Sequence, residues 1–263
     1  MLTCTYIIYL HNNQDGIQDL IESLDAIVGN FRREYIFLED GSTDDTLKVL
    51  KEKIGCLPNA TILVQKHLCS SICINKGLNL ASGDYIQFVE GNEVLKPDST
   101  ISLISACAKF NNEVAVGMVS NKKLSSTKVK NKLVNVEKPI EKILDSKIIE
   151  LRNIGRASTM ITRNIVEKIG NIDNEIFTHN LSLSLRCSKF SNFSYVKDHL
   201  SYCLKKKVID KKFESHNSIK AIYNFALENR EICNQYTAKL LNYLSSHALT
   251  TNKKIRFKLY SIT

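Results

Sequence analysis

The first ninety residues alternate between short apolar runs and longer segments in which apolar residues recur every three or four positions. This alternation is typical of a chain that builds β/α units around a parallel sheet. The run Tyr35–Leu38 is wholly aromatic and apolar, as in a strand buried on both faces. We predict strands at 2–12, 35–38, 61–65 and 84–89. We predict helices over 14–28, from about Asp45 onward and over 70–81.

The segment Tyr35–Thr46 passes from a strand into a polar turn and then into a helix start. Asp40 ends the strand, Gly41 turns the chain, and Ser42 or Asp44 can cap the helix. A carboxylate at the carboxyl end of a parallel strand faces the crevice in which open α/β sheets bind ligands. These residues alone support either an acidic turn that caps a helix or an acceptor for the base or ribose of a nucleotide.

Four motifs in one order resemble those of the family 2 glycosyltransferases, which have the GT-A fold. They are Asp40-Gly-Ser-Thr-Asp-Asp-Thr46, Asn75-Lys-Gly77-Leu, Ala81-Ser-Gly-Asp-Tyr-Ile86 and Lys96-Pro97-Asp98. The resemblance covers about Leu2 to Phe110 and thins afterwards. It implies that a nucleotide-diphosphate sugar is bound by residues near these motifs, namely Asn12, Glu39, Asp40 and Asn75.

The resemblance also implies the organisation of the whole chain. We expect an α/β protein of the GT-A class, with a mostly parallel sheet flanked by helices and a C-terminal helical extension. Residues 1–115 would form the nucleotide-sugar half of the GT-A domain, and 116–205 the acceptor-side half of the same domain. Residues 206–263 would form a basic helical tail.

This chain departs from the family at the position that holds a divalent metal ion. The family has Asp-x-Asp directly after the fourth strand, whereas this chain has Glu90, Asn92 and Glu93. Asn92 offers a neutral carbonyl where Mg²⁺ or Mn²⁺ prefers a carboxylate, so metal affinity should fall. Glu93 could restore the charge if its side chain turns inward; otherwise Glu90 and Glu93 are exposed acids of a turn. We expect a weakened Mn²⁺ or Mg²⁺ site at these three residues.

The position of the general base departs as well. In the family it is the Asp of a Glu-Asp pair ahead of a Leu-x-x-Arg-Leu helix, and counting back from Arg186 places Asn180 there. An amide cannot take a proton at neutral pH, whereas an unperturbed imidazole is half neutral near about pH 6.5. His179, directly before Asn180, is therefore a candidate base. The alternative is a surface histidine at a helix start.

Two functions remain open on these residues. The first is a glycosyltransferase that transfers a hexosyl-type sugar, with inversion by resemblance, from a nucleotide-diphosphate donor to a glycan or lipid-linked acceptor in polysaccharide biosynthesis. The second is a catalytically inactive pseudo-glycosyltransferase that binds or regulates a partner. A missing general base typically lowers a rate by about 10² to 10⁴. Catalytic competence therefore separates the two hypotheses.

The distribution of charge bears on the partners. Residues 205–263 hold 12 Lys and Arg against 4 Asp and Glu, so most of the chain's net charge of +9 lies there. The mixed basic and apolar segment Lys253–Tyr260 fits either an anionic membrane surface or an ordinary amphipathic edge. No recognisable nucleic-acid-binding motif accompanies this charge, so nucleic acid is not expected as a partner.

Cysteine content and hydropathy bear on the location. The eight cysteines form no repeated Cys-x-x-Cys pattern, and we find no signal peptide, which favours reduced thiols. No apolar run approaches the roughly 18 residues that a membrane span requires. We expect a cytoplasmic protein, with peripheral contact at the inner face of a membrane as the alternative that the tail suggests.

Overall fold

The computed structural model describes residues 1–66, 70–120, 136–140, 158–174 and 179–204, together with 217, 220, 221, 224, 225 and 227–229. For 136–140, 179 and 180 it describes the backbone alone. The strands are β1 Thr3–Leu10, β2 Arg32–Asp40, β3 Ala60–Gln65, β4 Tyr85–Glu90, β5 Glu93–Leu95, β6 Val114–Ser120, β7 Val136–Ile140, β8 Thr159–Thr162 and β9 Phe193–Cys203. The helices are α1 Ile17–Asp25, α2 Thr46–Lys53, α3 Ser70–Leu80, α4 Ser99–Phe110, α6 Arg163–Ile169 and α7 His179–Ser188, with short 3₁₀ turns at Gln14–Gly16 and Ile54–Cys56.

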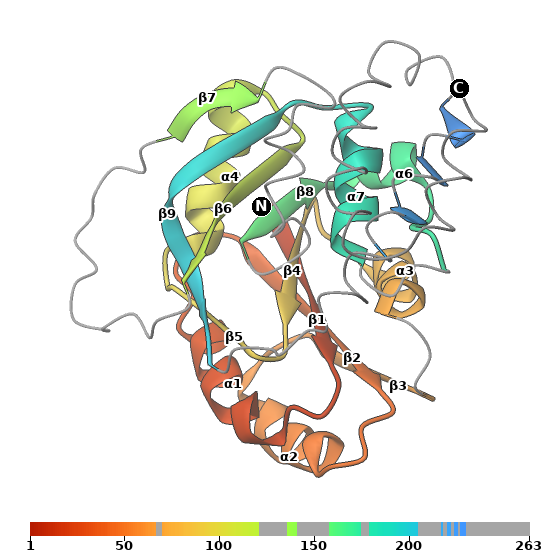
Figure 1. The fold of residues 1–263 in the computed structure, drawn as a ribbon. Coiled ribbons are helices and arrows are strands. Elements are labelled where there is room, and N and C mark those ends of the chain that lie inside the picture. The colour runs from red at the N-terminus through yellow and green to blue at the C-terminus, as the bar shows by residue number, and fades with distance from the viewer. Residues whose placement is uncertain are drawn as a thin grey trace.

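A mixed sheet runs through the described residues in the order β3-β2-β1-β4-β8-β6-β9-β5, and β7 pairs with β9 (Figure 1). Strands β3, β2, β1 and β4 are parallel neighbours, as the sequence predicts. Strand β8 runs antiparallel to both β4 and β6, and β5 and β7 run antiparallel to β9. The sheet is therefore parallel in its N-terminal half and mixed, rather than mostly parallel, beyond β4.

Helices cover both faces of the sheet (Figure 1). Helices α1, α2 and α4 share one hydrophobic core with Tyr6 and Ile8 of β1. Helices α3, α6 and α7 share the other core with Ile7 and Tyr9. Since side chains alternate along a strand, β1 contributes to both cores. Helix α3 packs closely, because a Cβ on Gly77 would lie 2.9 Å from Ile7 Cγ2.

The N-terminal elements predicted from the sequence are present with small shifts of their ends. The segment expected to be one helix over 14–28 begins as the 3₁₀ turn and ends, as α1, at Asp25. Its apolar stripe is buried as expected, at Ile17, Leu20, Ile21 and Leu24. The helix expected near Asp45 begins at Thr46.

Most of the basic segments lie outside the described residues. This applies to 122–132 and to Lys253–Tyr260, so the predicted membrane contact has no structural description. Within the predicted helical tail at 206–263, the described residues 217, 220, 221, 224, 225, 227 and 228 are helical. None of the helices in the described part of the chain has the length and apolar character that a membrane crossing needs.

Candidate functional site

The polar turns after β1, β2 and β4 lie at one edge of the sheet. Strand β1 runs between β2 and β4 and is parallel to both, so the carboxyl ends of all three strands meet there (Figure 1). Tyr9 of β1 is the register partner of Glu90 at the end of β4. Asp40, at the end of β2, accepts a hydrogen bond from the Tyr9 hydroxyl. The acids after the second and fourth strands therefore share one edge of the sheet.

The turns after β1 and β2 are joined by hydrogen bonds. Asn12 has a positive φ of 54°, and its side-chain Oδ1 accepts a 2.8 Å bond from the Thr43 backbone N–H. The Asn12 N–H in turn donates to Ser42 Oγ at 3.0 Å, and the Asn13 N–H donates to Thr46 Oγ1 at 2.7 Å. Asn12 thus shapes the rim of the edge by holding the two turns together.

Asp44 binds the first residue of α2 from within the same network, one position before the N-cap residue Asp45. Its Oδ1 accepts the Thr46 N–H at 3.0 Å, and its Oδ2 accepts the Gln14 N–H at 3.2 Å. Burial opposes ionisation of this carboxyl, but the hydrogen bonds from Thr46 and Gln14 outweigh it and hold the pKa of Asp44 below its ordinary value. Of the two predicted capping residues, Asp44 is the one that contacts the first helical N–H.

Asp40 is fully buried beneath this rim. Its carboxylate accepts hydrogen bonds from the Tyr9 hydroxyl at 2.9 Å and from Gln65 Nε2 at 3.0 Å. Gln65 Oε1 accepts a 2.8 Å bond from Nζ of Lys76, an exposed residue of α3. A polar chain therefore runs from the surface of α3 to Asp40. A ligand that contacted the Asp40 carboxylate directly would have to displace Tyr9 or Gln65.

The pKa of Tyr9 is changed by its position in this cluster. Burial first, and then the adjacent Asp40 carboxylate, raise the pKa of Tyr9 well above its ordinary value. The charge of Glu90, the register partner of Tyr9 on β4, raises the pKa of Tyr9 as well. The Tyr9 hydroxyl is therefore a fixed hydrogen-bond donor at neutral pH and not a proton acceptor.

Glu39 lies beside Asp40 in the chain but serves the other face of β2, since successive side chains alternate. Its side chain is buried, and Oε1 accepts the Ser42 N–H at 2.6 Å. Glu39 therefore fixes the turn that follows the strand, which is a positioning role.

The three predicted metal-binding residues, Glu90, Asn92 and Glu93, lie from the end of β4 to the start of β5. Glu93 is buried at the start of β5, where Cys203 Sγ donates to its Oε1 at 3.8 Å. The backbone carbonyl of Asn92 accepts the Leu204 N–H at 2.8 Å. Among the described residues, no group of three His, Cys, Asp or Glu side chains is placed to hold a metal ion. The described contacts of Glu93 are therefore with β9, on the side of Cys203.

Gly91, in the same turn, is required by close packing. Its backbone N–H donates to the Tyr9 carbonyl at 2.9 Å. A Cβ at this position would lie 2.6 Å from Asn13 Oδ1 and 2.7 Å from Leu10 Cδ2. The absence of a side chain therefore lets the turn after β4 approach the turn after β1.

Asn75 is placed away from the strand ends and joins α3 to the segment after α6. Its Nδ2 donates to the Ile172 carbonyl at 2.7 Å and to Asn174 Oδ1 at 2.8 Å, and its Oδ1 accepts the Ile172 N–H at 2.8 Å. The side chain is buried. The predicted nucleotide-binding residue is thus engaged in a contact that fixes the backbone.

The candidate base residues begin α7, and their side chains lie outside the described part of the chain. His179 and Asn180 are helical. The helix itself is held by Asp173, which accepts hydrogen bonds from Ser182 Oγ at 2.7 Å and from Arg186 Nη2 at 2.9 Å. Helix α7 is therefore anchored through the segment that Asn75 also binds.

Tyr9, Gln65 and Lys76 are members of the site that the motifs do not indicate. One signal was available, because parallel pairing of the third strand with the second places the end residues Gln65 and Asp40 side by side. Tyr9 could be found in the same way, as a polar-tipped side chain near the end of the central strand.

Comparison with known proteins gives the same family as the motifs. The model of Glycosyl transferase family 2 matches residues 5–170. The uncharacterized glycosyltransferase YibD of Escherichia coli K12 is 28% identical over 109 residues, covering 41% of this chain and 31% of YibD. The glycosyltransferase GlyA of Streptococcus pneumoniae is 25% identical over 114 residues, covering 43% of this chain and 16% of GlyA. The aligned part spans less than a third of either relative.

Solved structures share the fold. Staphylococcus aureus TarS 1–349 in complex with UDP-GlcNAc has a TM-score of 0.69 at 16% identity, covering 95% of this chain and 74% of that one. A second TarS structure has a TM-score of 0.69 at 13% identity, covering 96% of this chain and 44% of that one. The family model matches more than half of this chain. The chain therefore belongs to glycosyl transferase family 2 and has the GT-A fold.

Proposed function

We propose that this protein transfers a sugar from a nucleotide-diphosphate donor to a glycan or lipid-linked acceptor. The observation that carries the proposal is the convergence of the polar ends of β1, β2 and β4 at one edge of the sheet, in a chain of this family. Open α/β sheets bind ligands at such an edge. The similar TarS structure was solved with UDP-GlcNAc, so a uridine diphosphate sugar is the first donor to test.

In this proposal Asp40 acts through its neighbours. Its buried charge orients Tyr9 and Gln65, and Lys76 brings a positive charge to the exposed end of the same chain of hydrogen bonds. A donor would meet Gln65 and Lys76 first, where amide and ammonium groups can donate to base, ribose or phosphate oxygens. Asn12 and Glu39 would contribute by fixing the two turns that form the rim.

A divalent metal has a smaller role in this proposal than in the family pattern. Glu93 is directed to Cys203, and Asn92 supplies a neutral amide, which leaves Glu90, the register partner of Tyr9, as the available carboxylate. Mn²⁺ or Mg²⁺ would then be held mainly by the donor's own phosphates, with Glu90 as the protein ligand. We expect weak metal dependence of donor binding for this reason.

Titration of UDP into the full chain by calorimetry tests the proposal. We expect saturable binding with either Mn²⁺ or EDTA present, and an affinity difference between the two conditions of less than about tenfold, or about 1.4 kcal/mol. Absence of UDP and UDP-GlcNAc binding in both conditions would overturn the donor proposal. Binding seen in Mn²⁺ alone would instead overturn the weak metal dependence.

A matched pair of glycine variants locates that binding at the carboxyl edge. The Cβ of Gly91→Ala would overlap Asn13 Oδ1, so we expect UDP affinity to fall at least tenfold as the turn moves. A Cβ on Gly55, after α2, meets nothing within 4 Å, so Gly55→Ala should bind UDP like the parent chain. Equal affinities in the two variants would place nucleotide binding elsewhere on the molecule.

The base can be tested without knowing the acceptor, by measuring release of UDP when water replaces the acceptor. We propose that His179 takes the proton, because an imidazole can do so at neutral pH and the Asn180 amide cannot. His179→Ala should lower the rate about 10²-fold or more, and Asn180→Ala by less than tenfold. An unchanged rate in His179→Ala, with UDP still bound, would eliminate His179 as the base.

A further inference from the structure

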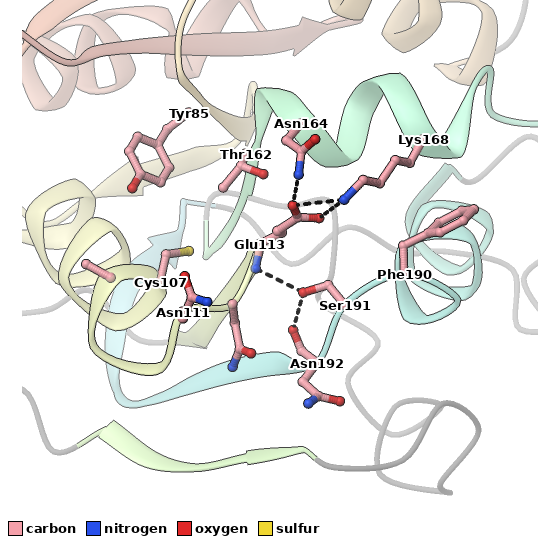
Figure 2. A pocket seen from close by; sticks show the side chains of 12 residues that line it. Tyr85, Cys107, Asn111, Glu113, Thr162, Asn164, Lys168, Phe190, Ser191 and Asn192 are labelled. Carbon is pink, nitrogen blue, oxygen red and sulfur yellow. Dashed lines mark hydrogen bonds and ion pairs between the residues drawn. The ribbon is translucent and has the colours of Figure 1, made fainter.

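A groove lies at the amino edge of the sheet, opposite the candidate donor site. Strands β4, β6 and β9 begin there and β8 ends there (Figure 2). Its volume is about 520 Å³, and a neighbouring hollow of about 350 Å³ shares Tyr85, Thr162 and Asn164 with it. Five residue steps along β4 separate Tyr85 from Glu90, which corresponds to roughly 16 Å. The groove is therefore distinct from the strand ends around Asp40.

Side-chain amides are the most frequent chemical group in this groove. Four of its twelve lining residues are asparagines, at positions 111, 112, 164 and 192. Each amide offers both a donor and an acceptor, as each hydroxyl of a sugar does. Thr162 and Ser191 add hydroxyls of the same dual character. This lining matches a ligand that presents many neutral hydroxyl groups.

Aromatic rings lie at two sides of the groove. Phe190, after α7, is 42% exposed, and Tyr85, at the start of β4, is partly buried (Figure 2). An exposed ring beside polar groups offers an apolar face next to hydrogen-bonding partners. A sugar ring has the complementary construction, with hydroxyls around its edge and C–H groups on its faces.

The charges in the groove cancel. The Glu113 carboxylate lies 3.2 Å from Lys168 Nζ and accepts a hydrogen bond from Asn164 Nδ2 (Figure 2). The neighbouring hollow carries Asp84 and Glu167 against Arg163, so it does not supply a positive field either. In a chain of net charge +9, this edge therefore does not attract phosphate groups. The balance favours a neutral ligand over a nucleotide or an anionic polymer.

One wall of the groove is fixed by internal hydrogen bonds. Ser191 Oγ accepts the Glu113 N–H at 2.9 Å and donates to the Asn192 carbonyl at 2.8 Å. Asn112 Nδ2 donates to Ser194 Oγ at 2.9 Å. A wall that is already ordered loses little conformational freedom when a ligand binds.

We propose that this groove binds a segment of a neutral oligosaccharide. It is a second carbohydrate site, separate from the proposed donor site, and its binding does not require transfer. The bound oligosaccharide would be the acceptor or product glycan, held at a distance from its reacting end. This further step rests on the proposed function. A groove continuous with its neighbouring hollow has room for more than one sugar unit.

Because the chain contains no tryptophan, one introduced tryptophan can report ligand binding by its fluorescence. Phe190→Trp keeps an aromatic ring at the groove and makes it the sole source of tryptophan emission. We expect a saturable change of that emission with at least one of cellohexaose, maltohexaose and chitohexaose, and none with the anionic hexagalacturonate. No saturable change with any of the three neutral probes, or stronger binding of hexagalacturonate, would overturn the proposal.

Variants then assign the binding to the groove. Adding Asn164→Ala and Asn192→Ala to Phe190→Trp should weaken binding about tenfold or more, since each removes amide hydrogen bonds. Adding Ile101→Ala, at a similarly exposed apolar residue outside the groove, should leave binding unchanged. Equal weakening by both changes would contradict the assignment. UDP should not compete in this assay, so failure of the donor proposal and failure of the groove proposal are separately visible.

Discussion

Two buried tyrosines on β1, Tyr6 and Tyr9, differ in the charge of the group to which their hydroxyls are hydrogen-bonded. The Tyr6 hydroxyl bonds to Thr100 Oγ1 at 2.8 Å, and the Thr100 hydroxyl donates a hydrogen bond to Gln87 Oε1 at 2.8 Å, so this network is neutral. The Tyr9 hydroxyl instead donates to the Asp40 carboxylate at 2.9 Å. Hydrogen bonds to charged groups contribute about 1.5–3 kcal/mol, roughly twice a neutral bond. Tyr9 is therefore part of what keeps a buried charge in place.

Replacing each tyrosine by phenylalanine tests this difference. Tyr9→Phe leaves the Asp40 carboxylate without one of its donors, so we expect it to lower the free energy of unfolding by about 2–3 kcal/mol. Tyr6→Phe removes a neutral bond and should cost about 1 kcal/mol. Denaturant unfolding of the three proteins measures both values. An equal loss in the two variants would show that Asp40 does not depend on Tyr9.

The sequence predicts the position of Asp40 but not its surroundings. An apolar run followed by Asp-Gly indicates a strand end and a turn, because both signals are local. The hydrogen-bond partners Tyr9 and Gln65 lie 31 and 25 residues away, and they depend on which strands pair and in which register. From the sequence alone, the Asp40 carboxylate is expected in an open crevice. It is fully buried because of the way these strands pair.

At the scale of elements, α3 and α7 are joined by a polar clip. Asn75 of α3 binds the backbone of Ile172, and Asp173 binds Ser182 and Arg186 of α7. Helix α3 also packs against β1 and β2, so the clip connects the face of the sheet to the helix that begins with the candidate base. Asn75 and Ile172 are separated by 97 residues in the chain, so this contact has no local signal in the sequence.

Two asparagines of α3 provide a matched test of the clip. Asn75→Ala removes three hydrogen bonds and leaves the Ile172 amide and carbonyl without that partner, so we expect a loss of about 2–3 kcal/mol. Hydrogen exchange should speed up in 172–174 and in α7. Asn79→Ala, at an exposed position of the same helix, should change stability by less than about 0.5 kcal/mol. Unaltered exchange in α7 of Asn75→Ala would show that the helix is held by other contacts.

The elements themselves were largely predictable, and the reason differs along the chain. Strands and helices through β4 follow from local periodicity and from Gly-containing turns. Beyond β4, strand β8 runs antiparallel to its neighbours, so the sheet becomes mixed. Neither this mixed order nor the burial of Glu93 in β5 has a local signal in the sequence. The sequence leaves open whether Glu93 turns inward or is an exposed acid of a turn, and its pairing opposite Cys203 places it inside.

At the scale of the molecule, the two edges of the sheet carry different chemistry. The carboxyl edge gathers turns that belong to β1, β2 and β4, with buried carboxylates held by internal donors. The amino edge carries a groove of amides and aromatic rings with balanced charge. A strand joins the two edges rigidly, so a glycan held at one edge and a donor held at the other keep a fixed separation.

The amino edge is also where three strands are tied by one carboxylate, Glu34 of β2. It accepts hydrogen bonds from Ser82 N and Oγ, each at 2.8 Å, and from Thr5 of β1, and Thr5 Oγ1 accepts the Gly83 N–H at 2.9 Å ahead of β4. Burial alone would raise the pKa of Glu34, but these hydrogen bonds outweigh it and hold the pKa below the ordinary 4.5. Folding is therefore linked to ionisation of this group.

The sign of the linkage sets the acid behaviour of the protein. Because the folded-state pKa lies below the unfolded one, the contribution of Glu34 is fully present above about pH 4.5 and is lost as pH falls through the lowered folded value. Glu34→Gln should lower stability at pH 7 and make the loss of stability below about pH 4.5 shallower. The change is limited to one proton, about 1.4 kcal/mol per pH unit, and partial exposure of Glu34 reduces it further.

Urea unfolding between pH 3 and 7 measures both effects. Glu52→Gln changes the net charge equally at an exposed site of α2, so an identical acid profile in the two variants would show that the Glu34 contacts are not the cause.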